Sequence, residues 1–492
     1  MINRNILKLK WCLLVGAALS SASCKKSFLD QKPYTAAVVS DAIKTEDDLN
    51  TALNGLYSSL RATDFYGRTY AVKGDLMADK AFLSSSNSGR YTAFNLYNIV
   101  KTDGYASNIW YNSYRAIKNA NLVINSGIAI SNDNISQMMS EAYAVRALVY
   151  FDLVRNFAKP YTADPNAAGV PIVTAFDQSA QPARKTVKEV YAQVLADIAK
   201  ANSLAKFNQG ATLTFTSTKT RTINSSFMSK YAIQALAARV YQNMGDWANA
   251  KTAALDVVNN SGFSLVPNGS LVSYWKGANP ITSKVETIFE VTSDANNSVS
   301  DGTLANIYVP KANGGSYGDI LATQDFYNSY SATDVRRQLL SPSTRSGQLG
   351  TAYYVTKYPI DINVDDVKIL RYADVLLILA EAYYNTGDPT NANLYLNMVA
   401  KSRDLSFAGY ASTGTQILED ILNERAKEFA FEGYRFWDLY RLQRTFVKPQ
   451  GQDASNAINQ SITVTPATLN LIFPIPNDEI VLNPNITQNS GY

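Results

Sequence analysis

The charged residues best spaced for chemistry lie between Asn423 and Arg441, in the segment NERAKEFAFEGYRFWDLYR. Glu424, Glu428 and Glu432 recur every four residues, so a continuous helix would place them on one face. Paired carboxylates of this kind carry out acid/base hydrolysis of glycosides. The arginines and the aspartate that follow at three-residue spacing would instead neutralise the acids across helical turns. We favour this structural interpretation, because catalytic carboxylates normally project from separate elements into a cleft.

Two further motifs resemble ion-binding or phosphate-binding loops but lack the residues that such loops need. The segment 361–366 (DINVDD) has three acids in six residues, without the central glycine and terminal glutamate of a calcium loop. The segment 314–318 (GGSYG) is rich in glycine but is not followed by the Lys-Ser/Thr pair of a phosphate loop. We therefore expect a solvated turn at the first segment and an ordinary loop at the second.

The composition excludes several kinds of catalytic and metal site. The chain has 492 residues with no histidine and two cysteines. It therefore lacks the imidazole of Ser-His or Cys-His nucleophile pairs and of histidine-containing zinc sites. Two cysteines are also too few for a four-thiolate metal site. We expect no cofactor and no bound metal.

Aromatic side chains in two long polar stretches are the better candidates for function. The chain has 31 Tyr and 19 Phe but 5 Trp, and flat rings at a surface suit the stacking of sugar C–H faces. Our ligand-binding candidates lie within 62–108 and 261–330: Tyr66, Arg68, Asp79, Arg90, Tyr91, Trp275, Asn279 and Tyr317, with Asp75, Tyr308 and Asp319 beside them. For any single one of these residues we favour packing within a loop, so the ligand-binding prediction concerns the two stretches together. A second alternative is a hydrolase that pairs Asp75 or Asp79 with an acid from 261–330.

The first 23 residues have the pattern of a signal peptide. Three basic residues precede an apolar and small run from Trp11 to Ala22, which is too short to span a bilayer as a mature helix. The run ends in Ser21-Ala22-Ser23-Cys24, similar to a bacterial lipobox, so we predict cleavage before Cys24 and lipidation of its thiol; the alternative is an ordinary secretory signal. Loss of Arg4, Lys8 and Lys10 would leave 42 basic against 41 acidic residues. A near-neutral chain of this kind argues against nucleic acid as a partner.

Hydrophobic periodicity predicts a mostly α fold with long polar insertions and a few short strands. Thr45 is a suitable N-cap, and Leu49, Leu53, Leu56 and Leu60 follow at helical spacing. The other predicted helices are 110–125, 138–157, 187–204, 227–244, 247–259, 370–385, 391–403 and 417–442, and the predicted strands are 285–291 and 471–474. We expect one large domain over 24–492, with its helical scaffold mainly in 45–61, 110–260 and 370–442. The ligand face would come mainly from 62–108 and 261–365.

Two helix pairs read as copies of one pattern. Residues 237–246 (AARVYQNMGD) precede Ala250 and Val257, while residues 379–388 (LAEAYYNTGD) precede Ala392 and Val399, so each landmark recurs after 142 residues. Small residues that allow close packing, a Gly-Asp turn and a small alanine on the second helix resemble a tetratricopeptide repeat. Such helix pairs stack into scaffolds and docking surfaces, and a chance pair of helical hairpins is the alternative.

Six segments in order resemble the SusD/RagB lipoproteins of Bacteroidetes. They are 24–30 (CKKSFLD), 110–121 (WYNSYRAIKNAN), 370–382 (LRYADVLLILAEA), the charged segment 424–441, and the tail segments 473–480 and 483–489. The resemblance implies a lipid-anchored protein at the cell surface of the outer membrane. It would capture a glycan without catalysis and pass it to a SusC-like TonB-dependent transporter. Some members of the family capture peptides instead, and a purely structural repeat adaptor is a further alternative.

Overall fold

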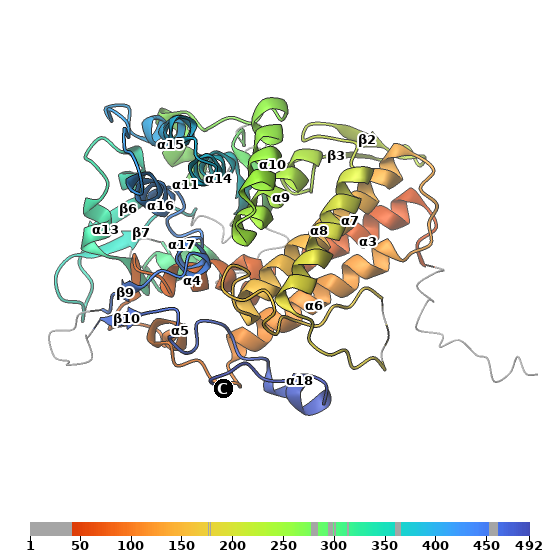
Figure 1. Cartoon of the computed structure of the whole chain (residues 1–492), viewed down its shortest axis with the longest axis horizontal. Coiled ribbons are helices and arrows are strands. Elements are labelled where there is room, and N and C mark those ends of the chain that lie inside the picture. Colours follow the sequence, from red (N-terminus) through yellow and green to blue (C-terminus); the bar gives the residue numbers. More distant parts are fainter. Residues whose placement is uncertain are drawn as a thin grey trace, which may run out of the picture.

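The computed structural model describes residues 42–175, 177, 179–276, 284–293, 299, 302–311, 314–359, 366–451 and 461–492 (Figure 1). The predicted signal peptide, Cys24, Asn279 and most of the acidic segment 361–366 lie outside these residues. Within the described residues, no helix combines the length and the apolar character needed to cross a membrane. No cluster of three or more potential metal ligands occurs in the same residues.

Helices form most of the molecule, as the periodicity predicts. The long helices are α3 (Glu46–Ser59), α6 (Gly104–Ile124), α7 (Asp133–Phe157), α8 (Val187–Leu204), α9 (Lys230–Met244), α10 (Trp247–Asn260), α14 (Tyr372–Asn385), α15 (Pro389–Arg403) and α16 (Gln416–Glu428). The shorter helices are α4 (Thr69–Leu76), α5 (Thr92–Leu96), α11 (Leu271–Lys276), α12 (Leu304–Tyr308), α13 (Gln324–Asn328), α17 (Arg435–Arg441) and α18 (Asn477–Leu482).

The first half of the chain forms a bundle around α7. Thr45 and Asp48 make a capping box at the start of α3, which confirms the predicted N-cap. Almost every residue of α7 is buried, because α3, α6 and α8 pack along it (Figure 1). The segment Leu471–Pro474, which we expected to be a strand, is not one. It runs beside the end of α7 instead, where the Phe473 N–H donates to the Asn156 carbonyl over 2.8 Å.

The two predicted repeats are helical hairpins of the same construction. Gly245 ends α9, and Gly387 follows the end of α14. Their φ angles are +74° and +80°, a conformation that favours glycine. Asp246 and Asp388 then cap α10 and α15 by accepting from the N–H three residues later, over 3.2 and 3.0 Å. Helix α10 packs against α14, so the two hairpins stack side by side (Figure 1).

Short strands occupy the long polar insertions. Four of them form an antiparallel sheet in the order β1-β5-β7-β6, with β1 (Ala81–Leu83), β5 (Ile320–Ala322), β6 (Leu340–Ser343) and β7 (Ala352–Val355). The other strands pair in twos: β2 (Thr212–Thr214) with β3 (Thr220–Thr222), β4 (Thr287–Val291) with β8 (Val367–Arg371), and β9 (Phe446–Lys448) with β10 (Ile462–Val464). Residues 62–108 and 261–365 are therefore not simple loops, since they contribute strands and short helices to the fold.

The predicted helix 417–442 is wrong in one respect, because it is broken between α16 and α17. Phe431 and Gly433 have φ of +64° and +82°, which ends the right-handed helix. The break lets the backbone of Gly433 lie against Gly74 of α4, where a Cβ on Gly74 would come within 1.9 Å of the Gly433 carbonyl oxygen. Glu432 therefore leaves the helical face that would have carried all three glutamates.

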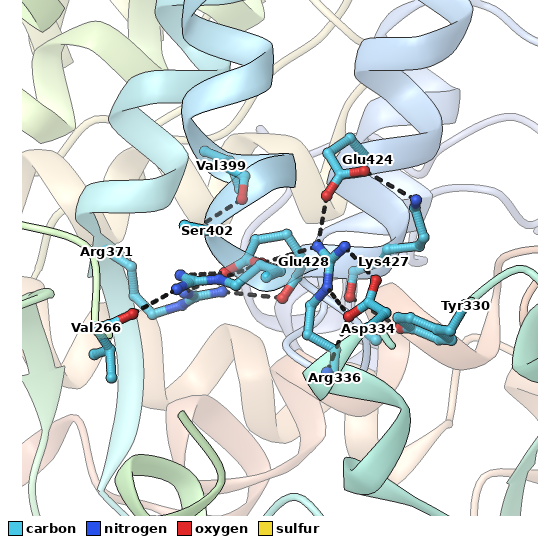
Figure 2. Close-up of polar contacts among 12 residues, drawn as sticks. Val266, Tyr330, Asp334, Arg336, Arg371, Val399, Ser402, Glu424, Lys427 and Glu428 are labelled. Carbon is cyan, nitrogen blue, oxygen red and sulfur yellow. Dashed lines mark hydrogen bonds and ion pairs between the residues drawn. The ribbon is translucent and has the colours of Figure 1, made fainter. Parts of the chain in front are cut away.

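The acids of this segment are structural and bind arginines from distant parts of the chain. Glu428 lies among Arg336, Arg371 and Arg403, with the closest N–O distances at 3.1, 2.9 and 3.0 Å. Figure 2 shows Glu428 with Arg336 and Arg371. Although burial opposes ionisation, these three guanidinium groups hold the pKa of Glu428 well below its usual range. The network joins α15, α16, β8 and the segment before β6, so it fixes the framework that carries the strands.

Candidate functional site

Three of the predicted aromatic ligands do not lie at the surface. The exposed fractions of Tyr66, Tyr91 and Trp275 are 1%, 1% and 3%, so the prediction that these rings face solvent is wrong. Burial first, and then the charge of Asp152, raise the pKa of the Tyr66 hydroxyl, which donates to that carboxylate. Trp275 lies on α11 with the ammonium of Lys357 3.9 Å from its ring centroid. All three side chains are packed inside the molecule against charged partners, a carboxylate for Tyr66 and cations for Tyr91 and Trp275.

Arg68, like Tyr91, is buried. Its side chain is buried, and its Nε donates to the Tyr91 hydroxyl over 2.8 Å. Burial raises the pKa of Tyr91 to about 12, so the hydroxyl stays neutral while it accepts this bond. The Arg68–Tyr91 pair anchors the start of α4 to the start of α5.

Arg90 and Tyr317 are the predicted candidates that the fold brings together at the surface. The guanidinium of Arg90 lies 3.9 Å from the ring centroid of Tyr317, and its Nη2 donates to the tyrosine hydroxyl over 2.9 Å. Both side chains are half-buried. They come from positions 227 residues apart in the chain, and the sheet explains how they meet. Leu83 of β1 pairs with Ile320 of β5, so the segments 84–90 and 314–319 lie at the same end of this strand pair.

The glycines of 314–318 shape the loop that presents Tyr317. A Cβ at Gly315 would lie 2.0 Å from the Val309 carbonyl oxygen, and one at Gly318, where φ is +57°, would lie 2.7 Å from the Pro310 nitrogen. The loop therefore folds tightly onto the end of α12, and the Tyr317 N–H donates to the Asn306 carbonyl over 2.8 Å. These glycines serve close packing of the backbone, in line with the expectation that this is not a phosphate loop.

Arg345 and Asp319 hold the surrounding loops together. Arg345, from the turn between β6 and β7, donates to the carbonyls of Ser86 and Gly318 and forms an ion pair of 3.1 Å with Asp319. The buried Asp319 carboxylate also accepts from the N–H of Ser88 over 3.1 Å. We call this three-loop surface, made of residues 84–90, 314–319 and 344–349, the loop platform.

The loop platform has the chemistry of a site for a polar ligand with flat faces. Arg90 and Tyr317 offer a stacked guanidinium and ring, while the exposed stretch from Ser85 to Gly89 adds hydroxyl and amide groups. Tyrosine, serine and asparagine are adaptable contact residues that lose little conformational freedom on binding. The arrangement suits a saccharide or an extended peptide. Arg345 holds the three loops in place without a ligand, so binding would order few further groups.

Sequence reasoning missed Arg345 and did not single out the serines of 84–88. The run SSSNS at 84–88 was a usable signal, because it follows a strand and contains only small polar residues. Arg345 carried no local signal, since its partners lie 26 to 259 residues away in the chain.

Asp79 lies apart from the loop platform, in a surface groove at the other end of β1. The groove has a volume of about 830 Å³, and its lining includes Lys80, Glu419, Lys427 and Arg444. Arg435 binds both oxygens of Asp79 over 2.8 Å each. Burial opposes ionisation of Asp79, but the bonds and charge of Arg435 outweigh it and lower the pKa to about 2. Asp79 is therefore an ionised structural partner.

Asp75 is also bound within the structure. It is buried, it accepts from the Gly433 N–H over 2.8 Å, and the Tyr308 hydroxyl lies 3.5 Å from it. Burial raises the pKa of this carboxyl well above its usual range. Neither Asp75 nor Asp79 presents a free carboxylate to solvent, which the hydrolase alternative would need.

Two family models match separate parts of the chain. The one described as "SusD family" matches residues 350–492, and the one described as "Starch-binding associating with outer membrane" matches residues 27–242. The chain is also 25% identical to the SusD-like protein P2 of Formosa agariphila, over 95% of this chain and 96% of that protein. A SusD-like protein of Bacteroides ovatus is 24% identical, over 89% of this chain and 83% of its own length.

Solved structures of similar sequence have the same fold. A putative sugar binding protein from Bacteroides vulgatus is 26% identical, with a TM-score of 0.79 over 92% of this chain and 99% of that one. A SusD superfamily protein from Bacteroides thetaiotaomicron is 28% identical, with a TM-score of 0.79 over 90% of this chain and 99% of that one. The two matching family models, the full-length relatives and the shared helical fold all support the SusD/RagB family for this chain.

Proposed function

We propose that this chain is a non-catalytic outer-membrane lipoprotein that binds a glycan and delivers it to a SusC-like TonB-dependent transporter. The observation that carries the proposal is the Arg90–Tyr317 stack on the loop platform, in a chain of this family. Stacked planar groups with hydroxyl and amide neighbours match the apolar faces and polar rim of a sugar ring. The description of one matching family as starch-binding supports a saccharide as the ligand class.

Membrane attachment is a separate part of the proposal. It rests on the lipobox-like sequence before Cys24 and on a matching family described as associating with the outer membrane. A lipid on Cys24 would tether the fold through the segment before α3. The variant Cys24→Ala should move the protein from the membrane fraction to the soluble fraction of cells, and a protein that stays in the membrane fraction would refute lipidation as the anchor.

Binding is tested by titration calorimetry and affinity electrophoresis against a panel of soluble polysaccharides. We expect at least one glycan to bind, and Arg90→Ala and Tyr317→Ala to lower the affinity at least tenfold without changing the melting temperature much. Tyr111→Ala is the matched control, since it removes a ring of 64% exposure on α6 that is remote in sequence from the loop platform. Binding that survives both variants would rule out the loop platform.

The same panel separates the alternatives. Tight binding of oligopeptides with no binding of any glycan would replace the saccharide by a peptide as the ligand. Release of labelled sugars by the pure protein would contradict the non-catalytic assignment. Co-purification with a transporter from outer membranes tests the partnership independently of the ligand.

A further inference from the structure

Arg90 carries the unpaired charge of the loop platform. Within the described residues its guanidinium forms no ion pair, whereas Arg345 on the same surface is paired with Asp319 over 3.1 Å. The hydrogen bond that Arg90 does make goes to the Tyr317 hydroxyl, which is uncharged at neutral pH. Since Arg90 is half-buried, part of its hydration is already lost. A negative group of a ligand would therefore interact favourably with it.

The guanidinium of Arg90 also keeps donors that a ligand can reach. Nη2 donates to Tyr317, while Nε and Nη1 donate to no described residue. Neither of these two nitrogens is among the buried polar atoms that lack a partner, so both remain accessible to solvent. The Tyr317 ring, 3.9 Å from the guanidinium carbon, fixes the place of the group. Adjacent N–H groups of a guanidinium can bind two oxygens of one carboxylate or sulfate at once.

A second cation, Lys311, lies beside the loop that carries Tyr317. Pro310 forms a β-bridge with Tyr317, and the Gly314 N–H donates to the Lys311 carbonyl over 3.1 Å, so Lys311 borders this loop. The Lys311 side chain is exposed, and in the described part of the chain it has no ion-pair partner. Lys311 therefore adds a positive charge at the edge of the loop platform.

The acids of this region are bound to other groups. Asp319 is the one acid in the sequence of the loop platform. It is buried, and its carboxylate accepts from Arg345 and from the N–H and hydroxyl of Ser88. On the neighbouring surface, Asp103 caps the start of α6, and Asp64 accepts from side chains of α4 and α6. The charge that the loop platform itself presents to a ligand is therefore positive.

We propose that the loop platform selects an anionic saccharide, whose carboxylate or sulfate group binds the Arg90 guanidinium. This inference rests on the proposed glycan-binding function and narrows the class of ligand. The hydroxyl and amide groups of residues 85–89 would bind the hydroxyls of the same sugar. A neutral sugar can also accept a hydrogen bond from Arg90, but such a bond is about half as strong as one to an ionised group. A neutral sugar would also leave the charges of Arg90 and Lys311 unpaired.

Polysaccharide pairs that differ in charge on the same backbone test the selection. Titration calorimetry on the full mature chain compares polygalacturonate with its methyl ester, for a carboxylate, and dextran sulfate with dextran, for a sulfate. We expect the charged member of at least one pair to bind at least tenfold more tightly, with an affinity that falls as salt is added. Equal affinities within both pairs, or binding of neutral glycans alone, would overturn the anionic selection and leave glycan binding intact. No binding of any glycan, here or in the wider panel, would refute both proposals.

Charge-removing variants locate the selection on the loop platform. Arg90→Gln keeps a planar amide beside Tyr317 but loses the charge, so we expect most of the preference for the charged glycan to be lost. Arg90→Lys keeps the charge without the paired donors and should retain part of the preference, and Lys311→Gln should lower it severalfold. Lys200→Gln removes the same charge from an exposed position on α8 and is the matched control. An unchanged preference in Arg90→Gln, or an equal loss in Lys200→Gln, would refute the role of Arg90.

Discussion

Arg371 and Glu432 form a two-pronged ion pair in the core, with Nε and Nη2 donating to the two carboxylate oxygens over 2.8 and 2.7 Å. Arg371 is 0% exposed, ends β8 and directly precedes α14. Glu432 lies in the break between α16 and α17. The pair therefore joins the second helical hairpin to the C-terminal helices, and the charges of the family signature hold the scaffold together.

Glu428 should be the most sensitive residue of this network. Replacing it with glutamine would leave Arg336, Arg371 and Arg403 buried with one counter-charge fewer, and breaking a buried pair in this way costs about 3–5 kcal/mol. We expect Glu428→Gln to lower the free energy of unfolding by that amount in urea titrations. Glu419→Gln, at a half-exposed pair with Arg444, should cost less than 1 kcal/mol. Equal losses in the two variants would contradict the central role of Glu428.

Replacing the N-cap of the second hairpin should lower the stability by less than replacing Glu428. Asp388→Ala removes the acceptor for the Asn391 N–H at the start of α15, so it should destabilise the protein by about 0.5–2 kcal/mol. Asp388→Asn should retain most of the stability, because asparagine caps helices about as well as aspartate. Thermal unfolding followed by circular dichroism distinguishes the two, and a loss of the same size in both would point to charge instead of capping.

Asp79 should make the protein sensitive to acid. Its folded pKa of about 2 lies below the ordinary aspartate value of 3.8, so its ion pair with Arg435 stabilises the fold above about pH 4. The contribution, about 2 kcal/mol, is lost as the pH falls from about 4 to about 2. Asp79→Asn should be less stable than the wild type at pH 6, and the difference should shrink by pH 2.5. Urea titrations at the two pH values measure it, and a constant difference would show that Asp79 acts through packing alone.

The glycine loop predicts a variant that separates binding from folding. Gly315→Ala would place a methyl group against the Val309 carbonyl and displace Tyr317 from Arg90. We expect the glycan affinity of this variant to be severalfold lower than that of the wild type. The melting temperature should drop by only a few degrees. Gly269→Ala, at a position with open space around the added methyl group, is the control. Unchanged binding in Gly315→Ala would show that the Arg90–Tyr317 geometry is not needed.

Sequence periodicity predicted the long helices well and the surface poorly. The prediction for 187–204 coincides with α8, because an amphipathic face and the Thr186 capping box are both local features. The break after α16 was not predictable, since it depends on Phe431 adopting a left-handed conformation where Gly433 meets Gly74. Strands of three or four residues are likewise too short to show an alternating pattern.

The candidate site was predictable in composition but not in geometry. Aromatic and charged residues in polar stretches correctly included Arg90 and Tyr317 as surface residues, although their role in binding stays a prediction. The same rule also selected Tyr66, Tyr91 and Trp275, which are buried beside charged partners. A tyrosine or tryptophan in a polar stretch looks the same in sequence whether its polar neighbours lie in solvent or inside the fold.

Because Gly74 contacts Gly433, α4 can pack fully only after the C-terminal part of the chain has been synthesised. Helix α4 leaves the ribosome more than 350 residues before the segment that covers it, as the Asp75–Gly433 bond spans 358 positions. Until that segment arrives, the buried face of α4 and the lysine at its centre stay exposed to water. The packing of α4 can therefore be completed only after the C-terminal helices have been made.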